Sequence, residues 1–114
     1  MDLTNNLDAY LNAHLDESIA ELCKLVSQTS VSAYKHGLIE CSEIIVGLMK
    51  KRGFKVQIFS NDVAPIIVAE RKGKSNKTLL FYNHYDVQPA EPLDLWKSPP
   101  FKPMIRDGKL FGRV

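Results

Sequence analysis

The segment KTLLFYNHYDVQPAEP, residues 77–92, places the strongest constraint on how this chain can fold. Residues 79–82 are apolar at successive positions, which is typical of a strand covered on both faces in a parallel or mixed sheet. The apolar run ends abruptly at His84, and Asp86 follows two residues later. Pro89 and Pro92 then prevent the strand from continuing, because proline has no backbone N–H to donate. A chain with this segment therefore needs further layers on both faces of its sheet.

Two helices are expected before this segment. Across residues 4–27, apolar side chains recur at spacings of three and four residues, so they share one face of a helix, and one of the polar residues at positions 4–6 caps its start. A second helix is expected from about Leu38 to Arg52, and Gly53 supplies the left-handed residue that ends it. The basic residues 50–52 then lie in the last turn, where the helix dipole favours them, so we interpret them as a helix end rather than a binding patch.

Strands are expected at residues 54–58, which alternate between apolar and polar, and at residues 65–71 and 78–84. Residues 103–113 predict a hairpin that turns at Asp107-Gly108. These elements together predict an α/β fold in which helices pack on a sheet. At 114 residues, the chain is expected to be one domain at most, or part of one.

The composition excludes several classes of function. A net charge of +2 with scattered Lys and Arg residues argues against nucleic acid as a partner. The sequence has neither a signal-peptide pattern nor an apolar run long enough to cross a membrane, so no membrane partner and a cytoplasmic location are expected. Cys23 and Cys41 are isolated and lie in helical segments, which favours reduced core residues over a disulfide.

The pair His84 and Asp86 is the candidate for chemistry. In open α/β sheets, ligands bind beyond the carboxyl ends of the strands, and His84 is expected at such an end. Imidazole is a common zinc ligand, and a carboxylate often holds its other ring nitrogen, which is a role that Asp86 can fill. A surface or hydrogen-bonded histidine is the alternative, since a single His-x-Asp pattern also occurs by chance. The other two histidines, His14 and His36, are expected to be structural or solvated.

Residues 82–113 resemble the first metal-binding segment of the zinc-dependent dipeptidase, carboxypeptidase and deacylase family, which includes carnosinase-like dipeptidases, acetylornithine deacetylase and succinyl-diaminopimelate desuccinylase. The similarity follows one order along the chain: His84-x-Asp86-Val87-x-Pro89, Trp96, Pro100-Phe101, Arg106-Asp107-Gly108, Leu110-Phe111 and Gly112-Arg113. The Asp-Val-Gln-Pro form looks most like the dipeptidase branch. The resemblance extends upstream to residues 22–32, which are similar to the exit of the family's first helix. The family usually has Pro-Ser-Val-Ser there, and Thr29 stands where that proline is common.

The resemblance implies that His84 is a zinc ligand and that Asp86 is the catalytic-site carboxylate that orients it. It also implies a partial three-layer helix-sheet-helix domain with a zinc-exopeptidase-like mixed sheet, truncated after this segment. Residues 1–114 would then be the N-terminal part of the catalytic domain, with the rest of that domain and any lid or dimerisation domain absent. The family uses two zinc ions, with cobalt or manganese as alternatives, and its remaining ligands and general base would lie beyond Val114.

Three hypotheses follow for function. The first is a hydrolase that cleaves dipeptides or N-acyl amino acids with metal-activated water, in a full-length parent for which a homodimer is one expected assembly. The second is that the chain alone is inactive, since one histidine supplies only one ligand bond. The third is a non-enzymatic module that pairs with a separately encoded second half. If the neighbouring strands are absent, the apolar segment is bare, and we expect poor solubility or self-association.

Overall fold

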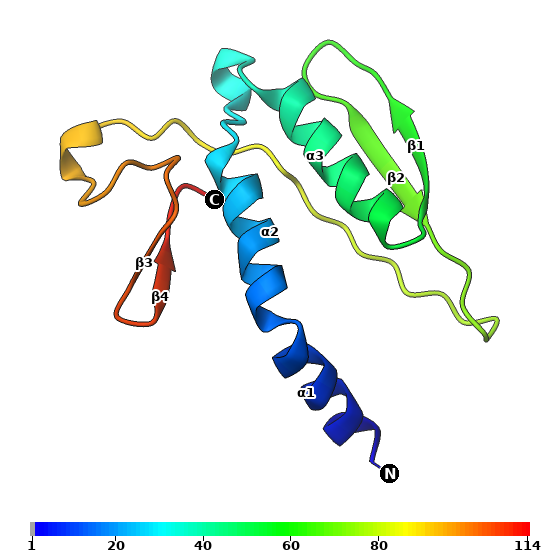
Figure 1. Cartoon of the computed structure of the whole chain (residues 1–114). Helices are drawn as coiled ribbons and strands as arrows, with labels where there is room; N and C mark the ends of the chain where they lie inside the picture. The colour runs from blue at the N-terminus through cyan, green and yellow to red at the C-terminus, as the bar shows by residue number, and fades with distance from the viewer. Residues whose placement is uncertain (1) are drawn as a thin grey trace.

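The computed structural model describes residues 2–114, which form α-helices and two small antiparallel sheets (Figure 1). The helices are α1 (Leu3–Ala13), α2 (Leu15–Ser27) and α3 (Leu38–Lys51). Strands β1 (Lys55–Phe59) and β2 (Ile66–Glu70) form one sheet, and β3 (Met104–Arg106) and β4 (Lys109–Phe111) form the other. Short 3₁₀ turns lie at Ser32–Tyr34 and Leu93–Leu95. The predicted α/β class is confirmed.

The first predicted helix is divided in two at His14, whose backbone leaves the helical conformation. The Nδ1 atom of His14 lies 2.8 Å from the Tyr10 carbonyl oxygen, and the two rings stack. A side chain that takes part in the backbone ladder in this way is a recognised cause of helix kinks. Asp2 caps α1 by accepting a hydrogen bond from the Thr4 backbone N–H, so the prediction of a cap at residues 4–6 was wrong by a few positions.

Helix α3 packs against both strands of the first sheet. β1 and β2 pair antiparallel with Gln57 opposite Val68, and both strands overlap the ranges predicted for them, residues 54–58 and 65–71. Gly53 follows α3 with a φ of 78°, which confirms the predicted left-handed helix end. The predicted hairpin is also present, and Asp107 and Gly108 both have positive φ values, as a type I′ turn requires.

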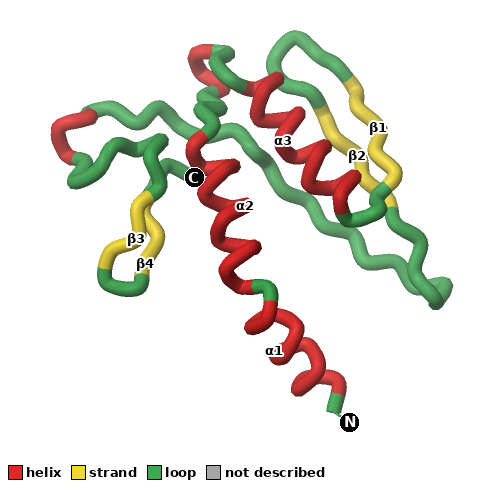
Figure 2. The backbone as a smooth tube through the Cα atoms, viewed as in Figure 1, coloured by secondary structure: helices red, strands yellow, loops and turns green. Residues whose placement is uncertain are grey.

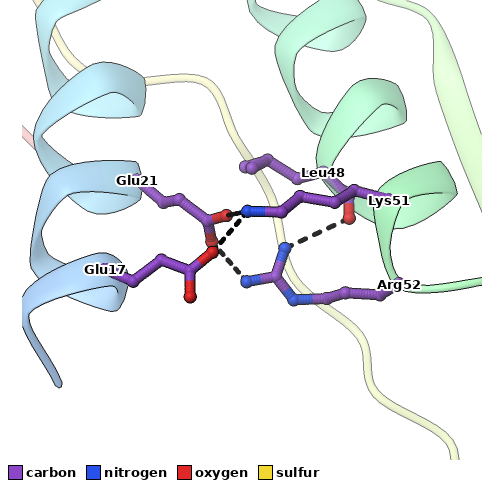
Figure 3. A network of polar contacts seen from close by, with 5 residues as sticks. All are labelled: Glu17, Glu21, Leu48, Lys51 and Arg52. Carbon is purple, nitrogen blue, oxygen red and sulfur yellow. Dashed lines mark hydrogen bonds and ion pairs between the residues drawn. The ribbon is translucent and has the colours of Figure 1, made fainter. Parts of the chain in front are cut away.

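The basic end of α3 does more than complement the helix dipole. Lys51 donates to Glu17 and to Glu21 of α2, at 2.5 and 2.9 Å, and Arg52 pairs with Glu21 (Figure 3). The guanidinium of Arg52, followed by the ammonium of Lys51, lowers the pKa of Glu21. These ion pairs link α2 to α3 across 30 or more positions of sequence.

Residues 78–84 are extended, but the structure pairs them with no strand within the described chain (Figure 2). The side chains at positions 79–82 are between 80% and 92% exposed. The prediction of a third strand was therefore wrong for this structure, although the backbone conformation suits one. A strand is defined by its ladder of hydrogen bonds, and residues 2–114 place no neighbouring strand beside this segment to complete one.

The buried residues gather in one small region. They come from the end of α2, the α2–α3 connection, α3 and the loops near residues 90 and 98–100. The buried hydrophobic residues of the core are Val26, Val31, Leu38, Cys41, Val46 and Ala90. The accessible surface is 9430 Å², against about 6,300 Å² for a self-contained folded protein of this mass. The radius of gyration is 16.6 Å, against about 13 Å for a compact domain of this length. Much apolar surface is therefore bare outside this core.

Candidate metal-binding site

His84 and Asp86 lie where the extended segment reaches the core. The side-chain Oδ1 atom of Asp86 is 3.2 Å from Nδ1 of His84, and the Asp86 backbone oxygen is 3.0 Å from the same ring nitrogen. Two acceptors on Nδ1 favour a proton on that nitrogen, so the lone pair of a neutral ring lies on Nε2. The structure therefore brings the two predicted site residues together in the arrangement expected of a metal-binding histidine.

The imidazole faces open space rather than the core. The His84 side chain is 78% exposed and lies on the wall of a hollow of about 450 Å³. Other residues that line the hollow are Ser32, Val63, Gln88, Pro89 and Val114. Asp86 also lines this hollow, so both members of the pair border the same open space.

The carboxylate of Asp86 is held in its charged form. The hydroxyl of Ser32 is the main cause that lowers the pKa of Asp86, partial burial opposes it, and the backbone and His84 act in the same direction as Ser32. A charged carboxylate accepts a hydrogen bond more strongly than a neutral carboxyl group. Asp86 is therefore in the state that holds an imidazole N–H most firmly.

The loop that carries the pair is fastened from distant parts of the chain. Between the two residues of the pair, the Tyr85 hydroxyl donates to the Pro65 carbonyl at 2.5 Å. After the pair, Arg113 donates to the carbonyls of Gln88 and Pro89, at 3.0 and 2.8 Å. The indole N–H of Trp96 donates to the Ala90 carbonyl at 2.8 Å. Arg113 and Trp96 belong to the motif quoted above, and the structure gives each of them a bond to this loop.

The α2–α3 connection supplies contacts that sequence reasoning missed. Val31 forms a parallel bridge with Val87, and Ser30 bonds to the backbone on both sides of Asp86. Residues 27–32 include Ser27, Ser30 and Ser32. Their abundance was an available signal, because small hydroxyl side chains readily bond to backbone groups.

The other candidate residues lie elsewhere. His14 interrupts the first helix, and His36 lines a second hollow beside the start of α3, whose lining does not include His84. Cys23 and Cys41 are free, as predicted, and burial raises the pKa of the Cys41 thiol. Within residues 2–114, no group of three or more His, Cys, Asp or Glu side chains is arranged to hold a metal ion. His84 and Asp86 would thus supply only part of a metal site.

None of the helices in the described chain is both long enough and apolar enough to cross a membrane.

Comparisons with known proteins agree with the resemblance found in the sequence. Residues 80–113 match the model of peptidase family M20/M25/M40. The chain is 38% identical to a succinyl-diaminopimelate desuccinylase of Azoarcus sp. (strain BH72), over 84% of this chain and 24% of the relative. It is 36% identical to the desuccinylase of Herminiimonas arsenicoxydans, over 87% of this chain and 25% of the relative.

A solved structure is also similar. An M20 family metallo-carboxypeptidase from Sulfolobus solfataricus superimposes with a TM-score of 0.80 and 33% identity, over 85% of this chain and 22% of that protein. The chain spans about a quarter of the length of the curated relatives it matches. The relatives named here are desuccinylases and a carboxypeptidase, so they give no specific support to the dipeptidase branch.

Proposed function

We propose that this chain, which belongs to the M20/M25/M40 peptidase family, is the N-terminal part of the catalytic domain of a metal-dependent hydrolase. In this proposal His84 is a zinc ligand and Asp86 orients its ring. The observation that carries the proposal is the geometry of one histidine. Its Nδ1 atom is within 3.2 Å of two oxygen atoms of Asp86, while the ring stands exposed at the edge of a hollow.

His84 and Asp86 fit one part of a zinc site. Nε2 of His84 has no hydrogen-bond partner among residues 2–114, and it is the nitrogen that a divalent cation would contact. A bound zinc, or cobalt or manganese in its place, would lower the pKa of a water molecule and polarise the carbonyl group under attack. Asp86 would keep the ring in one tautomer, and the hollow beside it would admit the substrate.

The substrate class follows from what the named relatives share. A desuccinylase and a carboxypeptidase both cleave the bond between an acyl group and an amine. We therefore propose that the substrates are N-acyl amino acids or small peptides, with dipeptides as the finer alternative that the Asp-Val-Gln-Pro sequence favours. No observation favours the non-enzymatic module over the hydrolase.

A cytoplasmic location and a homodimeric assembly belong to the same proposal. The two free cysteines, Cys23 and Cys41, are consistent with a reducing compartment. Sedimentation of the active protein would test the dimer, and fractionation of source cells would test the location.

The test is hydrolysis by a polypeptide that carries these residues together with the sequence encoded after Val114. N-succinyl and N-acetyl amino acids and dipeptides would be assayed by release of the free amine, with zinc, cobalt or manganese and after chelation. Substitution Asp86→Asn is expected to reduce activity about 10- to 100-fold, because it weakens the hold on the ligand, and His84→Ala at least as much. His36→Ala is the control, since that ring lies at the other hollow. Full activity of the His84→Ala variant would refute the proposal.

A further inference from the structure

Ser30 binds the chain on both sides of Asp86. Its hydroxyl donates to the Tyr85 carbonyl at 2.9 Å, and its own carbonyl accepts a hydrogen bond from the Val87 N–H at 2.8 Å. The Tyr85 carbonyl belongs to the peptide group before Asp86, and the Val87 N–H belongs to the peptide group after it. A single residue, 55 positions away in sequence, therefore holds both peptide planes that flank the candidate site carboxylate.

Fixing two successive peptide planes fixes φ and ψ of the residue between them, and with them the direction of its Cα–Cβ bond. The second plane also carries the Asp86 carbonyl, which lies 3.0 Å from Nδ1 of His84. Both oxygen atoms that face this ring nitrogen are thus aimed by bonds to Ser30. Without those bonds, residues 85–87 would depend on the Tyr85 hydroxyl bond to Pro65 and on the contact of the Ser32 hydroxyl with the Asp86 carboxylate.

Ser30 is itself firmly placed. It is 3% exposed and lies near the buried thiol of Cys41, whose pKa its hydroxyl lowers against the larger effect of burial. Val31, the next residue, forms a bridge with both His36 and Val87. The contact thus joins the loop to the small core, and its position does not depend on a solvent-exposed side chain.

We propose that Ser30 is a positioning residue for metal binding, which acts through Asp86 to set the tautomer and orientation of His84. The inference rests on the proposed function, because it assigns Ser30 a task in that same site. The two bonds from Ser30 hold Asp86, and Asp86 in turn holds the His84 ring. The ring is then already oriented when a metal ion binds, which is what preorganisation of a ligand means.

The test compares Ser30→Ala with Ser42→Ala in the full 114-residue chain. Ser42 is the matched control, because it is also 3% exposed and donates to a backbone carbonyl, that of Ile39, inside α3. Thermal melting would establish that both variants keep the fold. Two further measurements follow: amide hydrogen exchange of residues 85–89, and protection of His84 by Zn²⁺ against diethyl pyrocarbonate, followed by mass spectrometry with His14 and His36 as internal references.

Ser30→Ala keeps the backbone carbonyl that accepts from the Val87 N–H but removes the hydroxyl bond to the Tyr85 carbonyl. The loosened loop is expected to speed exchange of the Val87 amide about fivefold, the factor that one net hydrogen bond contributes. It should also raise the Zn²⁺ concentration that half-protects His84 by a similar factor, while Ser42→Ala changes neither. Equal effects of the two substitutions would overturn the inference, because a purely structural serine would behave in that way. Absence of Zn²⁺ protection in the unsubstituted chain would refute metal binding by His84 in this chain and with it the inference, whereas the proposed function is tested separately by hydrolysis in the longer polypeptide. Unchanged exchange in Ser30→Ala would independently refute the role of Ser30.

Discussion

The bare extended segment leads to the sharpest prediction. Residues 79–82 expose their side chains almost fully and leave their backbone N–H and C=O groups without strand partners in the described chain. Such an edge pairs readily with a second copy. Substitution Leu80→Lys should therefore suppress self-association, because it removes one of the apolar side chains and adds a like charge at each copy of the edge.

The magnitude follows from the burial of leucine. Leu80 is 92% exposed, so nearly all of its side chain is available to be buried, at about 1.5–3 kcal/mol. Two copies lose this contribution together, which amounts to about 3–6 kcal/mol per dimer. The dissociation constant of the dimer should therefore rise about 10²- to 10⁴-fold.

The assay is sedimentation velocity over a range of protein concentrations. Leu11→Lys is the matched control, because Leu11 is 62% exposed on α1 and leucine and lysine have similar helix propensities. We expect Leu80→Lys to be mostly monomeric at protein concentrations at which the unsubstituted chain and Leu11→Lys self-associate. A monomeric unsubstituted chain with a sharp cooperative melt would refute the argument, and so would dispersal by Leu11→Lys alone.

Three further predictions concern the stability and the activity of the chain. Gly112→Ala should destabilise the fold by about 1–3 kcal/mol, because a Cβ there would lie 2.5 Å from Val26 Cγ1. Gly47→Ala places its Cβ in open space and should instead stabilise α3 by about 0.5–1 kcal/mol. Thermal melting of the two variants would compare these effects. The lowered pKa of Glu21 means that its stabilising effect is complete above the ordinary value of 4.5 and is lost as the pH falls through the lower folded value; urea denaturation at several acidic pH values should show this loss, and Glu21→Gln should remove it. The purified chain by itself should hydrolyse neither dipeptides nor N-acyl amino acids, since a catalytic zinc ordinarily takes three protein ligands and His84 is one. Hydrolysis that is lost in the His84→Ala variant would contradict this prediction. Hydrolysis that persists in that variant would point to a contaminating enzyme.

Local chemistry made much of this protein predictable from the sequence. The alternation of residues 54–58, the left-handed Gly53 and the Asp107-Gly108 turn each depend on neighbours a few positions away, and the structure has all three. The pairing of His84 with Asp86 belongs to the same class, because a separation of two residues lets one loop bring the two side chains together. The break at His14 was missed, although it too is local, because helical periodicity continues through it.

Only the tertiary structure decided which groups support that pair. Ser30 and Arg113 reach the loop from 55 and about 25 positions away, and no periodicity or spacing indicates which backbone groups such side chains will bond. The apolar residues at 79–82 also show that sequence alone does not determine tertiary contacts. Their composition is that of a buried strand, yet burial requires neighbours in space, and the described chain places none beside them. Sequence pattern states what a segment is suited to contact, whereas the folded chain determines whether that contact is made.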